Sequence, residues 1–168
     1  LSKIKPSATI AISTLAASMK EQGKNIISLG MGEPDFDTPD NIKEAAYKAI
    51  KEGQTKYTAV AGITPLRKAI VKKLKKDNAL NYEIDQILVS TGAKQSIYNA
   101  LMASIEEGDE VVIPSPYWVS YPDIILLAGG KPKIIKCEEK DNFKLTPLKL
   151  KKAISKKTKW IILNSPSN

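Results

Sequence analysis

Apolar residues recur along this chain with two different periods, one typical of strands and one of helices. After residue 86, short β-branched runs alternate with stretches whose apolar residues have helical spacing. Strands are predicted at 86–90, 110–113, 133–137 and 159–163, and helices near 94–106, 118–128 and 146–156. Such alternation is typical of βαβ units, in which helices cover the faces of a largely parallel sheet. The expected fold class is therefore α/β.

The part of the chain before this alternation is predicted to be mostly helical. Helices are expected from about Ile10 to Gln22, from about Asp40 to Glu52 and from about Thr64, with a short strand at 25–29 and a turn-rich loop at 30–39. Thr38 or Asp40 can cap the second helix, and Pro65 suits the first turn of the third. The first helix faintly resembles a signal peptide, but its interrupting polar residues favour an amphipathic helix instead.

Three loops that follow predicted strands are candidates for ligand binding. They are Thr91-Gly92, Pro114 to Trp118 and Asn164 to Asn168. Ligands of parallel sheets bind beyond the carboxyl ends of the strands, so loops that share this edge favour a binding site. Where Gly92 opens a helix, free backbone N–H groups suit a phosphate. An ordinary strand–turn–helix crossover has the same local pattern, and this turn alone leaves both interpretations open.

The net charge of +8 raises the question of a nucleic-acid partner. Arg67 is the one arginine among 26 basic residues, however, and lysine is poorly suited to bidentate recognition of bases. The lysines are spread over many segments, so solvated helix faces explain them and no nucleic-acid partner is expected. The apolar run Ile161 to Leu163 is typical of a strand covered on both sides, and no run is long enough to span a membrane.

The chain contains no histidine and one cysteine, which restricts its chemistry. The absence of histidine excludes Ser-His-Asp and Cys-His catalysis and nearly all zinc chemistry within these residues, so no metal site is expected. Cys137 lies in a strand pattern, where a buried and inert thiol is expected. A single cysteine forms no internal disulfide, and the cytoplasm is the simplest compartment. The charged loop from Glu138 to Thr146 shows no evident chemistry.

Six stretches, taken in order, resemble a known family. They are Lys5 to Thr9, Gly32 to Pro39, Thr55 to Tyr57, Gly92 to Gln95, Pro116 to Pro122 and Asn164 to Asn168. The chain resembles the fold-type I, pyridoxal-phosphate-dependent aminotransferases of class I, and within them the bacterial aspartate aminotransferase subgroup, some of whose members also act on prephenate. Each stretch alone is unspecific, whereas the ordered set is highly specific.

The resemblance implies a function and an architecture. An amino group would pass between aspartate, or glutamate and prephenate-type dicarboxylates, and a 2-oxo acid through an aldimine of pyridoxal 5'-phosphate. The implied fold is a three-layer αβα sandwich with a mostly parallel sheet. Residues 1–40 would form an N-terminal arm and the start of a small domain, and 41–168 the first half of the cofactor-binding large domain.

The resemblance also assigns the cofactor site. Gly92, Ala93 and Lys94 match the phosphate cup, although many relatives have glycine in place of Ala93. Trp118 matches the aromatic residue that stacks on the pyridine ring, and a tryptophan merely packed in the core is the alternative. Tyr57 matches a tyrosine that reaches the phosphate of the neighbouring subunit, which implies a homodimer with shared sites. A surface tyrosine would look the same in the sequence.

Three further residues match substrate-binding positions. Asn168 matches the amide that donates to the phenolic oxygen of the cofactor and touches the α-carboxylate of the substrate. Gly32 matches a glycine whose backbone approaches that carboxylate. Lys5 matches a lysine of a mobile arm that is tied to the use of prephenate. Ordinary turn chemistry at Asn168 and Gly32, and a solvated lysine at residue 5, are the alternatives.

No catalytic residue is expected within the chain itself. The Schiff-base lysine, the aspartate that pairs with the pyridinium nitrogen and the arginine that binds the α-carboxylate would all lie beyond residue 168. The chain is therefore expected to be the N-terminal part of a longer protein and to be inactive alone. Two other functions stay open: a non-catalytic α/β binding module, and another fold-type I enzyme such as a lyase.

Overall fold

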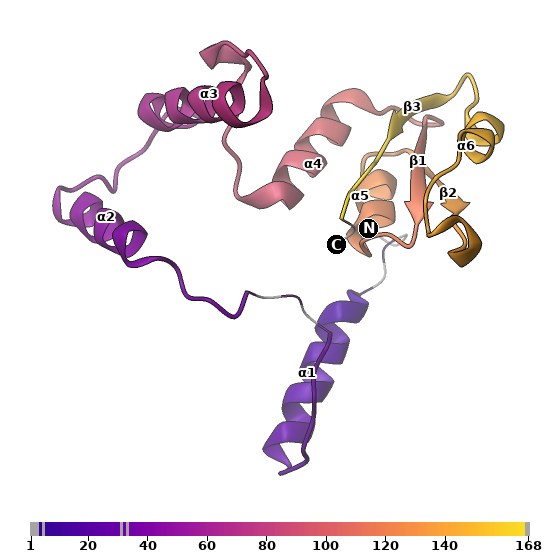
Figure 1. Ribbon diagram of the computed structural model, residues 1–168, viewed down its shortest axis with the longest axis horizontal. Coiled ribbons are helices and arrows are strands. Elements are labelled where there is room, and N and C mark those ends of the chain that lie inside the picture. The colour runs from indigo at the N-terminus through magenta and orange to yellow at the C-terminus, as the bar shows by residue number, and fades with distance from the viewer. Residues whose placement is uncertain (1–3, 5, 31, 33, 167–168) are drawn as a thin grey trace. The chain divides into compact units, whose positions relative to one another are not determined.

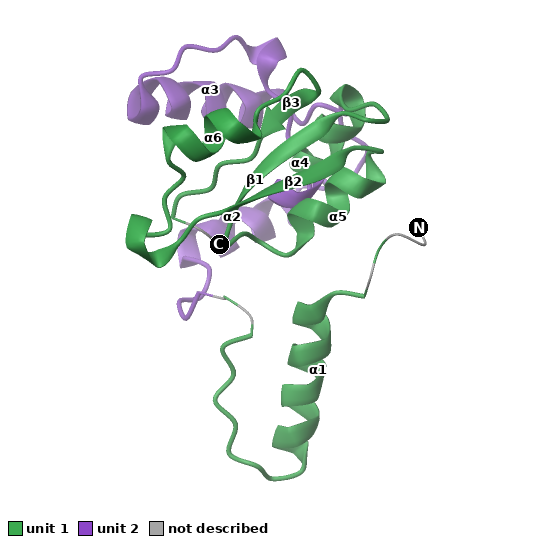
Figure 2. Cartoon of the chain, turned by 90° about the vertical axis from the view of Figure 1, so that its right-hand side faces the viewer, with its two compact units in different colours: residues 1–32, 96–168 green, residues 33–95 purple. Residues whose placement is uncertain are grey.

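The computed structural model describes residues 4, 6–30, 32 and 34–166. They divide into two compact units, coloured separately in Figure 2. The first unit lies within residues 1–32 and 96–168, and the second within residues 33–95. The expected division into an arm and small domain (1–40) and a large domain (41–168) stays a prediction.

The first unit contains a parallel sheet of three strands. Strand β1 (Glu110–Ser115) lies between β2 (Lys131–Lys136) and β3 (Thr158–Ile161), as Figure 1 shows. Val112 is level with Lys133 on β2 and with Ile161 on β3. These strands fall where β-branched runs predict them, within two residues at every end, and the expected parallel sheet is confirmed.

Helices cover both faces of this sheet. The helices of the first unit are α1 (Ala8–Glu21), the part of α4 (Gly92–Ser104) from Ser96 onward, α5 (Ser120–Leu127) and α6 (Pro147–Ala153), with the short 3₁₀ helix η2 (Glu139–Asp141). On one face Val111 and Ile113 pack with residues of α4 and α5, and on the other Val112 packs with α6. This alternation follows from the two-residue period of a strand. The expected three-layer αβα arrangement is therefore confirmed in this unit.

The second unit is helical in the part of the chain that the structure describes. It contains α2 (Asp40–Lys51), α3 (Thr64–Asn78) and the 3₁₀ helix η1 (Ile84–Gln86), and α4 begins in it. Pro65 occupies the first turn of α3, as predicted. The predicted cap of α2 is wrong, because Pro39 takes the N-cap position and makes no side-chain bond there. Asp40 is instead the first helical residue, where its carboxylate pairs with Lys43 at 3.2 Å.

Two of the predicted strands are not formed. Residues 25–29 are not in a sheet, and the side chains of Ile27 and Leu29 are 86% and 93% exposed. Residues 86–90 include the end of η1 and a segment that is tied by Val89 N–H to the carbonyl oxygen of Ala61 at 3.0 Å, not to a neighbouring strand. Apolar β-branched runs satisfy the residue preference of a strand, but a strand also needs a neighbour for its ladder of hydrogen bonds.

The apolar run at the end of β3 is covered only in part. Ile161 packs against the cluster on the α6 face and Ile162 against the cluster on the other face, as a strand buried on both sides requires. Leu163, in contrast, is 71% exposed, and here the prediction is wrong because β3 has already ended at Ile161. Cys137 is buried, as predicted. Across the described ranges, no helix is both long and apolar enough to cross a membrane.

The core of the first unit predicts the effect of a cavity on stability. Ile125 of α5 is fully buried, whereas Leu127 on the same helix is 40% exposed. In the full-length protein we expect Ile125→Ala to lower the free energy of unfolding by about 2–5 kcal/mol, because lost contacts and a cavity add. Leu127→Ala is the matched control and should shift the urea midpoint clearly less. Equal shifts for the two variants would contradict this description of the core.

Candidate functional site

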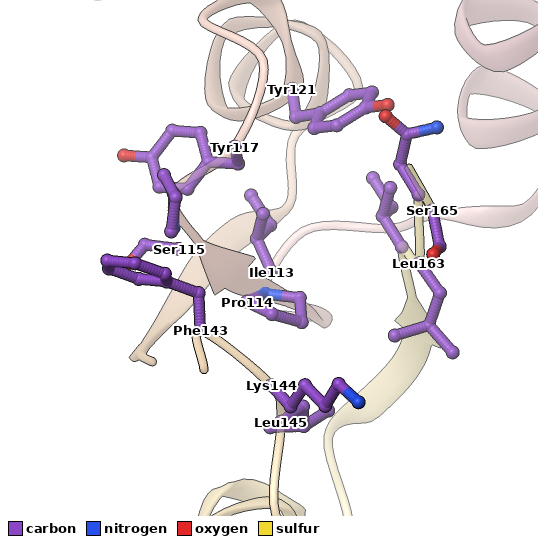
Figure 3. Close-up of a pocket in the computed structure, with 13 residues that line it drawn as sticks. Ile113, Pro114, Ser115, Tyr117, Tyr121, Phe143, Lys144, Leu145, Leu163 and Ser165 are labelled. Carbon is purple, nitrogen blue, oxygen red and sulfur yellow. The ribbon is translucent and has the colours of Figure 1, made fainter. Parts of the chain in front are cut away.

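A cavity of about 320 Å³ lies at the carboxyl ends of the strands of the first unit. It is lined by residues from three loops and the strand ends that precede them: Ile113, Pro114, Ser115, Pro116, Tyr117, Tyr121, Phe143, Lys144, Leu145, Ile162, Leu163, Asn164 and Ser165. In Figure 3, Tyr117 and Phe143 stand on one side of it and Leu163 and Ser165 on the other. Two of the three predicted ligand loops, those that follow β1 and β3, therefore meet at one edge of the sheet.

The loop after β1 places aromatic side chains beside this edge. Its peptide bond between Ser115 and Pro116 is cis. Trp118 and Tyr121 form an edge-to-face pair, with ring centroids 5.4 Å apart and an angle of 83° between the planes. Tyr121 is only 7% exposed and belongs to the core on the α4 and α5 face, against which Trp118 also packs. Such pairs give a ring a defined orientation, so the plane of Trp118 is fixed by a buried neighbour.

The loop after β2 supplies the third wall and was not predicted to have a role. Phe143 lines the cavity from a left-handed backbone conformation (φ 56°), which follows another such residue, Asn142 (φ 52°). Asparagine tolerates this conformation, and its presence before an aromatic residue is the signal in the sequence that could have indicated a fixed turn. Phenylalanine rarely adopts it, so the surrounding contacts must hold the loop in place.

Ion pairs supply those contacts. The ammonium group of Lys149, on α6, lies 2.8 Å from a carboxylate oxygen of Asp141 and 3.3 Å from one of Glu138. Lys140 also pairs with Glu138, at 3.0 Å. The hydrogen bond to Asp141, followed by that to Glu138, raises the pKa of Lys149. The hydrogen bonds from Lys140 and then Lys149 lower the pKa of Glu138 below its usual 4.5. We call Glu138, Asp141 and Lys149 the loop clamp.

The predicted phosphate turn lies at the start of α4, in the second unit. Gly92 has a φ of 78°, which favours glycine, and its N–H group donates to the carbonyl oxygen of Ser90 at 2.9 Å. The N–H group of Thr91 donates to the side chain of Gln95, one turn into the helix. Ala93 and Lys94 follow within the first helical turn, where alanine is favourable, so the departure from glycine at residue 93 costs nothing in the backbone.

The other predicted site residues lie in loops or outside the described part of the chain. Tyr57 is fully exposed in the second unit, in the loop between α2 and α3. Gly32 lies in a loop of the first unit, and a Cβ atom there would meet nothing within 4 Å. No described residue therefore explains why glycine stands at position 32. Lys5 and Asn168 fall outside the described residues. Of the loop after β3, the structure describes the residues up to Pro166.

Comparison with known proteins identifies the family. Residues 24–168 match the family described as aminotransferase class I and II. The chain belongs to this family. The resemblance inferred from the six ordered stretches is thereby confirmed, and so is the fold type that it implies.

Curated relatives in this family match the chain over its whole length. It is 56% identical to the probable aspartate/prephenate aminotransferase of Rickettsia conorii and 55% identical to the aspartate/prephenate aminotransferase of Cereibacter sphaeroides. Both alignments cover 100% of the chain and 42% of the relative. The chain thus spans well under half the length of the curated relatives that it matches.

Solved structures of aminotransferases have the same fold. The aspartate aminotransferase from Rhizobium meliloti matches with a TM-score of 0.93 and 53% identity, over 99% of this chain and 42% of that one. The aspartate aminotransferase from Thermus thermophilus with maleate matches with a TM-score of 0.96 and 40% identity, over 99% and 44%.

The loop clamp predicts a local effect that depends on pH. In the full-length protein, Lys149→Met should speed amide hydrogen exchange of residues 139–145, while Lys151→Met, on an exposed position of the same helix, should not. Folding lowers the pKa of Glu138, so the contribution of its ion pairs to the stability of the loop is present above pH 4.5. That contribution is lost as the pH falls through the pKa of the folded state. The protection that Lys149 adds should therefore shrink below pH 4.5. Equal exchange in both variants would rule the clamp out.

Proposed function

We propose that the protein containing this chain is a pyridoxal-phosphate-dependent aminotransferase that moves an amino group between aspartate, glutamate or a prephenate-type dicarboxylate and a 2-oxo acid. The observation that carries the proposal is the identity of 55–56% over the whole chain to relatives named aspartate/prephenate aminotransferase. A non-catalytic binding module would not need the ordered site loops. A lyase on the same fold is the second candidate, because fold alone does not fix the reaction.

The residues present fit the cofactor on which this family generally depends. A phosphate dianion needs several N–H donors at one point, and the first turn of a helix has N–H groups without acceptors in the helix. Gly92, Ala93 and Lys94 form such a turn: Gly92 supplies the positive φ that leads into the helix while its own N–H group donates to Ser90, and Lys94 adds an ammonium group. When bound, pyridoxal phosphate withdraws electrons from the α-carbon of the substrate. The residues of this chain would bind and orient it.

Trp118 is proposed to face the ring of the cofactor. A flat aromatic ring is recognised best by a side chain whose own plane is fixed in advance, and the edge-to-face contact with buried Tyr121 fixes the plane of Trp118. The neighbouring cavity is lined by the aromatic residues Tyr117, Tyr121 and Phe143, which would limit the access of water on that side. Trp118 therefore acts by orientation, without carrying a proton.

The remaining site residues are proposed from the resemblance. Asn168 would donate a hydrogen bond to the phenolic oxygen of the cofactor, and Gly32 would admit the carboxylate of the substrate close to the backbone. Tyr57 would reach the cofactor phosphate of the second subunit in a homodimer with shared sites. Its full exposure on the surface of the second unit supports an action outside its own unit. The cytoplasm is the proposed compartment.

The two tryptophans offer a test of the site. The full-length protein should transfer the amino group of aspartate to a 2-oxo acid, and Trp118→Ala should weaken cofactor binding by about 0.5–1.5 kcal/mol, the value of aromatic stacking beyond burial. Turnover should fall further, because a misplaced ring misaligns the reacting atoms. Trp160→Phe is the control: Trp160 lies on β3 and donates to Ser104 at 2.9 Å. An unchanged turnover number in Trp118→Ala would remove Trp118 from the site.

Lys5 predicts the choice between substrates. Prephenate has a second carboxylate that a flexible ammonium group can meet as the arm closes, whereas aspartate is smaller. Lys5→Ala should lower kcat/KM for prephenate about ten- to a hundredfold, as expected for one charge-assisted hydrogen bond. The value for aspartate should fall less. Equal losses for both substrates, or none, would leave plain aspartate aminotransferase as the function.

A further inference from the structure

The one arginine of the chain joins α3 to the segment that leads into the turn at Gly92. Arg67 is half-buried, and its Nε donates to the carbonyl oxygen of Ile87 at 3.1 Å. Its Nη2 donates to the carbonyl oxygen of Ile84. All these residues belong to the second unit. A side chain far from the turn in sequence therefore holds the backbone just before it.

The contact requires the chemistry of arginine. The two carbonyls that Arg67 binds lie at the start of η1 and just after its end at Gln86. The carbonyl oxygen of Ile84 also accepts from the N–H group of Ile87 at 3.3 Å, and its second lone pair is available to the guanidinium group. A guanidinium group has several N–H donors in a rigid planar fork, so it can hold two carbonyls at a fixed separation. Lysine has one nitrogen at the end of a flexible stem. This difference explains why arginine stands here in a chain that otherwise uses lysine.

A second contact holds the same segment two residues further on. Val89 N–H donates to the carbonyl oxygen of Ala61 at 3.0 Å. The next residue, Gly62, has a φ of 100°, and a Cβ atom there would lie 2.6 Å from Cγ2 of Val89. Only glycine permits both this backbone conformation and this close approach. The segment is thus fixed at residues 84, 87 and 89.

The turn begins directly after these fixed points. Only Ser90 and Thr91 separate Val89 from Gly92, and both take part in the hydrogen bonds of the turn. Two residues leave the chain little freedom to compensate for a shift of Val89. The position of the first turn of α4 is therefore inherited from the contacts of Arg67, Ala61 and Gly62.

We infer that Arg67 is a positioning residue for cofactor binding, which sets where the N–H groups at the start of α4 meet the phosphate. The inference rests on the proposed function, because that function assigns the phosphate to Gly92, Ala93 and Lys94. Arg67 acts through the backbone of residues 84–91 and touches no cofactor itself.

The test compares two ligands that differ only in the phosphate. In the full-length protein stripped of cofactor, dissociation constants are measured for pyridoxal phosphate and for pyridoxal. The dissociation constant of pyridoxal divided by that of pyridoxal phosphate isolates the contribution of the phosphate from that of the ring and aldehyde. The variants are Arg67→Lys, Arg67→Met and Gly62→Ala, and the control is Lys68→Met. Lys68 is exposed on the same helix, so its loss removes one positive charge, as Arg67→Met does.

Arg67→Lys and Arg67→Met should each reduce this ratio about tenfold, equivalent to about 1.4 kcal/mol. Gly62→Ala should reduce it as well, by displacing Val89, and Lys68→Met should leave it within about twofold of the wild type, well under that 1.4 kcal/mol. Should Arg67→Met fail to fold, Arg67→Lys and Gly62→Ala decide the matter.

Two results would overturn the inference, and they are distinguishable. If the wild type strongly prefers pyridoxal phosphate and Arg67→Lys keeps that preference while losing thermal stability, Arg67 is purely structural and the proposed function stands. If the wild type binds both ligands equally, the phosphate assignment falls, and the role of Arg67 falls with it.

Discussion

The first unit depends on the burial of β1 on both of its faces. Val111, Val112 and Ile113 are almost completely inaccessible, and they point alternately toward the helices α4 and α5 and toward α6. A strand buried in this way cannot slip by one residue, because every side chain would exchange faces. The register of β2 and β3, the two core clusters and the direction in which the loops leave the sheet all follow from this one constraint.

The site inherits its geometry from that strand and from side-chain contacts that act on the backbone. Trp118 is oriented by Tyr121, which is itself part of the core. The loop that contains Phe143 is held by Lys149, and the segment before Gly92 is held by Arg67. In each case a side chain on a regular element fixes an irregular segment. Loops can then be precise without a sheet ladder of their own.

Elements with a strong local pattern were predicted well from the sequence, and those that depend on distant partners were not. The helices and the strands β1 to β3 follow from apolar periodicity, and Pro65 marks the start of α3 correctly. The runs at 25–29 and 86–90 have the composition of strands, but composition does not show whether a neighbouring strand exists. The six ordered stretches indicated the family, and the proposed roles of Trp118 and the Gly92 turn rest on that resemblance, because neither local pattern points to them alone.

Phe143 and Arg67 were missed as contributors for a physical reason. The loop of Phe143 is held by ion pairs of Lys149 with residues 8 and 11 positions away, and Arg67 binds carbonyls 17 and 20 positions away. No local pattern records such contacts, although a lone arginine among lysines and an asparagine before an aromatic residue are visible signs. Lys5 and Asn168 lie outside the described residues, and their roles rest on the resemblance.

The outer side of β2 determines how well this edge of the described sheet could pair with a strand of another molecule. The N–H groups of Lys131 and Cys137 donate toward β1, to the carbonyl oxygens of Asp109 and Ser115. The alternate residues of β2 therefore face outward, and among them Ile134 and Lys136 direct their N–H groups away from β1. Pro132 has no N–H group to offer, and a lysine follows two residues after Ile134. An approaching strand from another molecule would find a broken row of donors and a positive charge. Within the part of the chain that the structure describes, this edge of the sheet is therefore poorly suited to pairing with a strand of another molecule.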